Sequence, residues 1–222
     1  MTEETPQVRD PTRFLFLGVG HAGGTLISHL PKRVPEFDYA AVDTDRSSLA
    51  ALPFERKILL GESCANGLGT GGDPELAESC LEEGHPDLYA LFQDVDVVIL
   101  VAGLGGGTGS VIGAALAEMA REAGALVLCA LVRPLEAEGG RCRERADAAV
   151  VLYRDISDGV FLFPLEVLKA SEDPSMLLPR LLKRCGMEIG RSLGGLAVLL
   201  RTGWLLPMSV QDLVQTLRRA DG

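Results

Sequence analysis

A glycine-rich stretch between two apolar segments is the feature that most constrains this chain. Residues 102–110 read AGLGGGTGS, after five aliphatic residues at 97–101 and before an alanine-rich segment at 111–123. The aliphatic run predicts a buried strand and the alanine-rich segment a helix. A tight turn needs one or two glycines, whereas this loop has four within five positions. We therefore interpret it as a loop whose N–H groups, with the helix N-terminus behind them, bind an anion, usually a phosphate.

Two further glycine-rich loops lie next to predicted strands and helices. The first, GVGHAGG at 18–24, follows an apolar run at 13–17 and has GxGxxG spacing. The other, GLGTGGDP at 67–74, ends in an aspartate and a proline that are typical of a helix start. We expect that helix over 74–92, open to interruption at Gly84 and Pro86. Ligands of parallel sheets bind beyond the carboxyl ends of the strands, so the three loops are expected to converge there.

Acidic residues are expected around these loops. Asp43 ends a predicted strand at 37–42, about 20 residues beyond the first glycines, where a dinucleotide-binding fold places a ribose-binding acid. Asp45 fits either such a site or the N-cap of the helix that follows. Glu138 lies in a loop at 134–140, after the next buried strand.

The rest of the chain continues the alternation of strands and helices. This order predicts an α/β fold of three layers, Rossmann-like, with a mostly parallel sheet and helices on both faces. We expect a flexible tail at 1–12 and a single domain at 13–222. The further strands are expected at 125–132, 159–163 and 196–200, and the further helices at 141–154, 174–193 and 209–219.

The composition excludes several other classes of protein. The chain has 21 basic and 31 acidic residues and a formal net charge of -10, so we expect no nucleic-acid partner. Its five cysteines form no CxxC pair, which argues against a zinc site or disulfide framework and fits a reducing cytoplasm. The first ten residues are polar and do not resemble a signal peptide, and no apolar run reaches the roughly 18 residues of a transmembrane helix. A P-loop motif, GxxxxGK[ST], is also absent from the sequence.

The loops occur in an order that resembles the tubulin/FtsZ superfamily of GTP-binding filament proteins, on the FtsZ side. GGGTGS at 105–110 is similar to the signature GGGTG[ST] of that family. The segments 18–24, 43–45 and 67–74 resemble its first three phosphate loops, and 134–139 resembles the loop whose glutamate contacts the ribose.

The resemblance implies a nucleotide-binding domain that takes GTP or GDP, with Mg²⁺ as a possible accompanying ion and no metal ligand from a side chain. The implied nucleotide-binding residues are Gly18, Gly20, His21, Ala22, Gly23, Asp43, Asp45, Gly69, Thr70, Gly71, Gly72, Gly103, Leu104, Gly105, Gly106, Gly107, Thr108, Gly109, Ser110, Pro134 and Glu138. From the glycine turn alone, His21 is expected to be a solvated loop residue.

The sequence departs from the FtsZ pattern at the catalytic loop. In that family an acidic loop, NxDxxD, from the next subunit of a filament polarises the attacking water. In its counterpart here, PMSVQD at 207–212, Ser209 replaces the first aspartate and Asp212 is the one acid that remains. A serine cannot carry the charge that polarises water. Asp212 is thus the candidate catalytic residue, although it also fits a first-turn acid behind a Ser209 cap. We expect weak or no intrinsic GTPase activity.

A second departure concerns the residues that read the base. Leu165 and Gly186 stand where FtsZ has an asparagine and an aspartate, so guanine selectivity is expected to be reduced. Glu166 is a candidate substitute. The arginine that follows the ribose loop corresponds to Cys142.

The third departure is length, because the FtsZ activation domain that follows the nucleotide-binding domain is expected to be absent. The central helix at 174–193 would then expose an apolar face that is available to a partner. We expect self-association or binding to another FtsZ-like subunit, and an indirect association with membranes is compatible with this.

Three hypotheses about function follow. The first is a cytoplasmic GTP- or GDP-binding subunit with a role in assembly or regulation. The second is a structural protein that has kept the fold and lost the nucleotide, which the altered base-reading positions favour and the intact phosphate glycines oppose. The third is an NAD-type oxidoreductase, suggested by the GxGxxG spacing and Asp43, but it leaves the GGGTGS loop unexplained.

Overall fold

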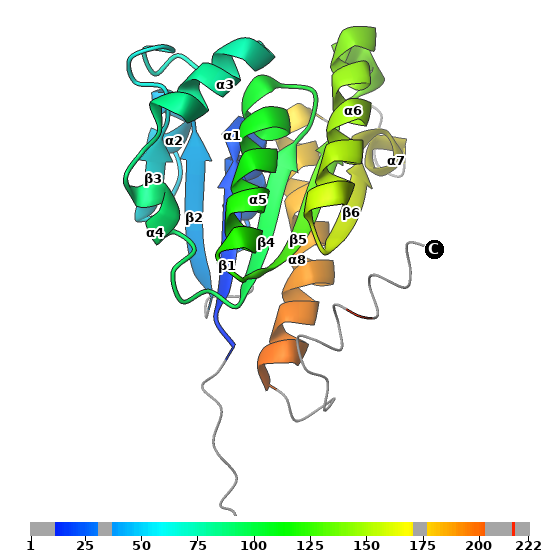
Figure 1. The fold of residues 1–222 in the computed structure, drawn as a ribbon. Coiled ribbons are helices and arrows are strands. Elements are labelled where there is room, and N and C mark those ends of the chain that lie inside the picture. Colours follow the sequence, from blue (N-terminus) through cyan, green and yellow to red (C-terminus); the bar gives the residue numbers. More distant parts are fainter. Residues whose placement is uncertain (1–11, 31–36, 171–176, 203–214, 216–222) are drawn as a thin grey trace, which may run out of the picture.

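The chain folds around a six-stranded parallel sheet with the order β3-β2-β1-β4-β5-β6 (Figure 1). The computed structural model describes residues 12–30, 37–170, 177–202 and 215. The predicted α/β class with a parallel sheet is confirmed. The strands are β1 (Phe14–Val19), β2 (Asp38–Asp43), β3 (Arg56–Leu59), β4 (Val97–Gly103), β5 (Leu126–Arg133) and β6 (Gly159–Pro164).

The central strands have few polar residues because helices cover both faces of the sheet. All six residues of β1 and the first six of β4 are buried. Strands buried on both faces have near-continuous apolar sequences instead of alternating ones. The strands expected at 13–17 and 97–101 are confirmed as β1 and β4, and they form the centre of the sheet.

The helices form a layer on each face, and each layer encloses its own apolar core. In Figure 1, α3, α5 and α6 lie in front of the sheet and α8 lies behind it. The front layer consists of α3 (Pro74–Glu83), α4 (Asp87–Ala90), a π-helical turn η1 (Thr108–Ile112), α5 (Gly113–Glu122) and α6 (Gly140–Ile156). The rear layer consists of α1 (Gly20–Ile27), α2 (Arg46–Ala50), α7 (Leu165–Ala170) and α8 (Leu178–Thr202), and a short 3-10 turn η2 (Glu136–Glu138) precedes α6.

The predicted strand at 196–200 is wrong, because α8 continues through this segment to Thr202. Ile189, Leu193, Ala197 and Leu200 are all buried. Their spacing of four, four and three residues is that of one helix face. A short apolar run has strand length whether it belongs to a strand or to a helix, so the run alone misled the prediction.

Two glycines bring α8 close to α1. A Cβ atom at Gly186 would lie 2.6 Å from the carbonyl oxygen of Leu26, and one at Gly190 would lie 2.6 Å from the Leu30 side chain. Glycine lowers the intrinsic stability of a helix by about 1 kcal/mol relative to alanine. Here it allows a helix contact that a larger residue would prevent.

The exposed apolar side chains of α8 include Leu178 and Val198, which lie near opposite ends of the helix. Within the described segments, no helix is both long enough and apolar enough to span a bilayer. The predicted tail at 1–12 and helix at 209–219 lie almost entirely outside the described residues.

Candidate functional site

A cavity of about 440 Å³ opens at the carboxyl ends of β1 and β4. These neighbouring strands mark the point where the strand order reverses. The connection after β1 goes to the rear layer and the one after β4 goes to the front layer, which separates the two loops. Such a switch point is where open α/β sheets bind ligands, and the volume lies within the range of ligand sites.

The three predicted glycine loops meet at this cavity together with the loop that follows β5. Seventeen of the predicted nucleotide-binding residues line it: Gly20, His21, Ala22, Asp43, Asp45, Gly69, Thr70, Gly71, Gly72, Gly103, Leu104, Gly106, Gly107, Thr108, Gly109, Pro134 and Glu138.

The other four predicted nucleotide-binding residues lie behind the lining and shape the loops. They are Gly18, Gly23, Gly105 and Ser110. A Cβ atom at Gly23 would lie 2.2 Å from the carbonyl oxygen of Val101, so only glycine lets α1 lie this close to β4. One at Gly18 would lie 2.8 Å from the carbonyl oxygen of Gly23. The hydroxyl of Ser110 accepts a 2.9 Å hydrogen bond from the N–H of Gly105. Asp212, the candidate catalytic residue, lies outside the described residues.

Two of the helix starts that face the cavity have no side-chain caps. Neither α1, which begins at Gly20, nor η1, which begins at Thr108 and leads into α5, receives a capping side chain. By contrast, Asp45 caps α2 and Asp73 caps α3. The first N–H groups of a helix have no partner within the helix, and the N-terminus carries a partial positive charge. The cavity therefore offers two sets of N–H donors to an anion.

Hydrogen bonds join the loops at 43–45 and 67–74 to the central loop at 102–110. The hydroxyls of Thr44 and Thr108 are 2.9 Å apart and buried. The carbonyl oxygen of Thr44 accepts a 3.0 Å hydrogen bond from the N–H of Gly69, and the N–H of Arg46 donates to the carbonyl oxygen of Gly67 at 3.0 Å. Thr44 thus connects three loops, a role that the sequence pattern did not indicate.

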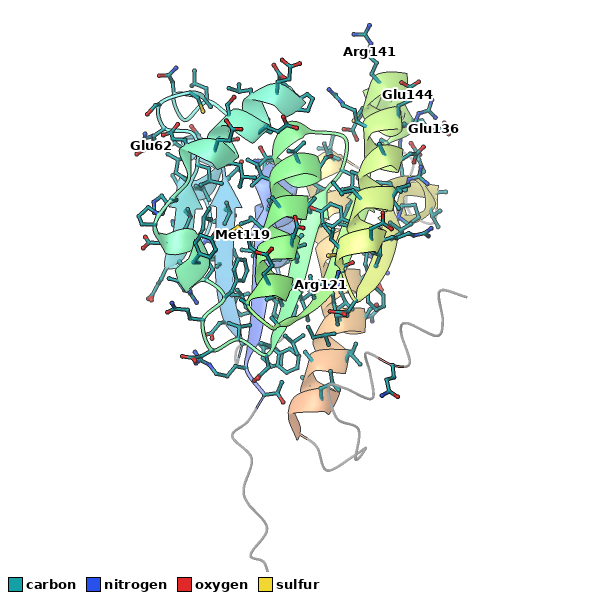
Figure 2. All side chains as sticks on the ribbon, in the orientation of Figure 1. Glu62, Met119, Arg121, Glu136, Arg141 and Glu144 are labelled. Atoms are coloured by element: carbon teal, nitrogen blue, oxygen red, sulfur yellow. The ribbon has the colours of Figure 1, made fainter. Side chains whose placement is uncertain are left out.

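Helix α6 holds two of the loops from the front layer. The buried hydroxyl of Tyr153 donates a 2.7 Å hydrogen bond to the carbonyl oxygen of Gly109. The guanidinium of Arg145 donates at 2.6 Å to the carbonyl oxygen of Gly72. The charged residues of a surface helix usually form a solvated face, and Figure 2 shows Arg141 pointing away from the molecule. Arg145 departs from that expectation, and only the tertiary contact reveals it.

Asp43 and Asp45 differ in their surroundings. Asp43 is 4% exposed, and its carboxylate accepts hydrogen bonds from the N–H groups of Thr44 at 2.7 Å and Asp45 at 3.3 Å. Burial raises the pKa of Asp43 to about 6, and these hydrogen bonds oppose the rise. Asp45 accepts from the N–H groups of Ser47 and Ser48, so it is the N-cap of α2 and also lines the cavity.

Two glutamates brace the loop after β5. The carboxylate of Glu138 accepts a 2.7 Å hydrogen bond from the N–H of Leu135. Glu166 accepts a 2.7 Å hydrogen bond from the N–H of Glu136, and it is not among the residues that line the cavity. Glu166 therefore positions the loop from outside the cavity lining.

An apolar wall closes one side of the cavity. In the described part of the chain, α7 and α8 contribute Leu165, Leu178 and Leu182 to the lining. Leu165 lies where expected. Gly186, which stands where FtsZ has an aspartate, lies one turn further along α8, faces α1 and is not among the residues that line the cavity. The two leucines of α8 carried no signal in the sequence beyond helical apolar spacing.

Other polar side chains near the cavity are engaged. Arg133 lines it and forms an ion pair with Asp147. His21, exposed in the first turn of α1 and not in a loop, has its Nδ1 2.9 Å from the Ser48 hydroxyl. Among the described residues, no group of three or more His, Cys, Asp or Glu side chains is arranged to hold a metal ion.

The strand order and the glycine loops at the switch point define an α/β phosphate-binding domain. The chain belongs to the Tubulin/FtsZ family, because the family model of the GTPase domain matches residues 13–172. The cell division protein FtsZ of Methanothermobacter thermautotrophicus is 30% identical over 211 residues, which cover 95% of this chain and 55% of that protein. FtsZ of Helicobacter pylori is 32% identical over 164 residues, or 71% of this chain and 43% of the relative.

Solved structures agree with this assignment. The empty FtsZ dimer of M. jannaschii superposes with a TM-score of 0.78 at 28% identity, over 88% of this chain and 57% of that one. The GTPγS-bound protofilament of CetZ2 from Haloferax volcanii superposes with a TM-score of 0.80 at 25% identity, over 94% and 64%. The chain spans about half the length of the curated relatives that it matches.

Proposed function

We propose that this chain binds GTP or GDP in the glycine-lined cavity and holds it mainly through the phosphates. The uncapped starts of α1 and η1 at the cavity carry this proposal. The space in front of Gly71 and Gly106 is open, since a Cβ atom at either position would meet nothing within 4 Å. A phosphate chain can approach such a backbone closely and accept its N–H donors. Asp43 and Glu138 are the proposed partners of the ribose hydroxyls.

A Mg²⁺ ion that accompanies the nucleotide would be held largely by phosphate oxygens and water. Magnesium commonly binds nucleotides through one or two carboxylates and keeps several waters. Asp43 and Asp45 lie at the cavity, but their carboxylates already accept backbone hydrogen bonds, so we expect no direct metal ligand from a side chain. When bound, the ion would neutralise part of the phosphate charge.

The apolar wall implies weak selection of the base. The side chains of Leu165, Leu178 and Leu182 offer no hydrogen-bond acceptor to the edge of guanine. Strong discrimination requires polar groups that are left unpaired by the wrong ligand, and an apolar surface does not supply it. We therefore expect the affinities for GTP and ATP to differ by less than about tenfold, or 1.4 kcal/mol.

A glycine variant tests the cavity directly. Gly106→Val places a side chain in open space within the cavity, so it should leave the fold intact and lower GTP affinity by at least about tenfold. Gly140→Val is the matched control, because Gly140 is equally open and lies outside the lining. Isothermal titration measures both. Equal affinity in the two variants would place the nucleotide elsewhere.

We further propose slow or absent hydrolysis and a role in assembly or regulation, through self-association or another FtsZ-like subunit. The support is the loss of acids around Asp212 in the segment that resembles the catalytic loop. Phosphate release should be slow, and Asp212→Ala should leave it unchanged. Fast hydrolysis that this substitution abolishes would contradict the proposal. Sedimentation with GTP and with GDP tests self-association.

The nucleotide-free structural role remains the second candidate, and the apolar wall favours it. It predicts that no nucleotide raises the melting temperature. A cytoplasmic location is likewise a proposal, which rests on the five unpaired thiols.

A further inference from the structure

Two cysteine side chains touch beside the third glycine loop. The thiol of Cys64 donates a 3.2 Å hydrogen bond to the sulfur of Cys80. Cys64 is exposed in the segment between β3 and the loop, whereas Cys80 is fully buried in α3. Figure 2 shows Glu62, two residues before Cys64, at the outer edge of the molecule. One sulfur of the pair is therefore reachable from solvent and the other is shielded.

The surroundings hold the two sulfurs in this arrangement. A Cβ atom at Gly61 would lie 2.2 Å from the Cys80 sulfur and 3.1 Å from the Cys64 sulfur, so the missing side chain of Gly61 makes room for both. The carboxylate of Glu83, one turn after Cys80 on α3, accepts hydrogen bonds of 3.0 and 3.2 Å from the N–H groups of Ser63 and Cys64. The backbone of Cys64 is thus tied to the same helix that carries Cys80.

We propose that Cys64 and Cys80 are an oxidisable dithiol site that reacts with low-molecular-weight disulfides and closes to an internal disulfide. Bond formation requires the sulfurs to approach by only about 1 Å. The bond would close a ring of residues 64–80, which contains the third glycine loop. That loop lines the cavity with Gly69, Thr70, Gly71 and Gly72, so the modification would restrain one wall of the site.

The reaction runs in two exchange steps. The thiolate of Cys64 attacks a sulfur of the disulfide RSSR, forms a mixed disulfide and releases RS⁻. The thiolate of Cys80 then attacks the sulfur of Cys64, and the second RS⁻ leaves. Two protein thiols are oxidised, one RSSR is reduced to two RSH, and the two thiol protons end on the two leaving thiolates.

The order of the steps follows from exposure. Cys64 is the accessible member of the pair and reacts first, whereas burial raises the pKa of Cys80 to about 12, so Cys80 gives up its proton only in the course of the second step. The contact between the two sulfurs offsets the high pKa of Cys80, because each of two groups held together is present at a high effective concentration for the other.

The experiment treats the reduced full chain with oxidised glutathione in the absence of nucleotide. Peptide mass spectrometry after alkylation should find a Cys64–Cys80 cross-link. Amide hydrogen exchange over 65–73 should slow by at least about tenfold in the oxidised protein, because the ring restricts local opening. Cys64→Ser should abolish both effects, and Cys142→Ser should change neither.

Two results would overturn the inference. A stable glutathione adduct on Cys64 without a Cys64–Cys80 disulfide would show that Cys80 does not attack the mixed disulfide. A cross-link with unchanged exchange over 65–73 would show that the bond does not restrain the loop. Neither result depends on nucleotide binding, so this test is independent of the proposed function.

Discussion

Asp43 is a buried carboxyl group whose titration links the cavity to the stability of the fold. Burial raises its pKa from the ordinary 3.8 to about 6, so the folded state binds its proton more tightly than the unfolded state. This contribution to the free energy of unfolding is fully present below about pH 4 and is lost as the pH rises through about 6.

Asp43→Asn should therefore weaken the pH dependence of stability. Between pH 5 and pH 7.5 the wild-type chain should lose roughly 1.4 kcal/mol through this group, whereas an amide oxygen accepts the same two N–H groups without titrating. Urea unfolding of both proteins at the two pH values measures the difference. Asp155→Asn, at an exposed acid of α6, is the control and should keep the wild-type dependence. The same dependence in Asp43→Asn would show that Asp43 does not titrate in this range.

At the scale of single elements, the glycines of helices have opposite effects in different places. Gly23→Ala would set a methyl group 2.2 Å from the carbonyl oxygen of Val101, so α1 would have to move away from the sheet. Overpacking against backbone has no flexible neighbour to absorb it, and we expect a loss of about 3 kcal/mol in the free energy of unfolding, the upper end of the usual range.

Gly195→Ala is the matched comparison. Gly195 lies inside α8 with nothing within 4 Å of an added Cβ, so this change should raise stability by about 0.5–1 kcal/mol. Chemical denaturation of the two variants checks the contrast. If both variants changed the free energy of unfolding by the same amount, α1 would not lie as close to β4 as described.

The elements show where a sequence suffices and where it does not. Asp73 followed by Pro74 predicted the start of α3 correctly, because capping chemistry is local. The first glycine turn proved to be part of α1, which already begins at Gly20. The run at 196–200 became part of α8, because its burial depends on packing against other elements and no local signal records that packing.

For the whole molecule, the sequence predicted which loops meet but not what holds them. The glycine loops converge because the strands of the sheet are parallel and their carboxyl ends lie at the same edge. The hydrogen bonds from Tyr153 and Arg145, and the wall of Leu178 and Leu182, join segments separated by many residues. Such contacts have no periodicity or motif, so only the folded chain reveals them.

The central claim is that the cavity holds a nucleotide by its phosphates, and isothermal titration with GTP, GDP, GMP and guanosine in the presence of Mg²⁺ tests it most directly. If the N–H groups at the two helix starts bind the phosphates and the apolar wall contacts the base, affinity should fall with each phosphate removed, and guanosine should not bind measurably. Equal affinity for GTP and guanosine, or no binding of any of the four, would contradict the account.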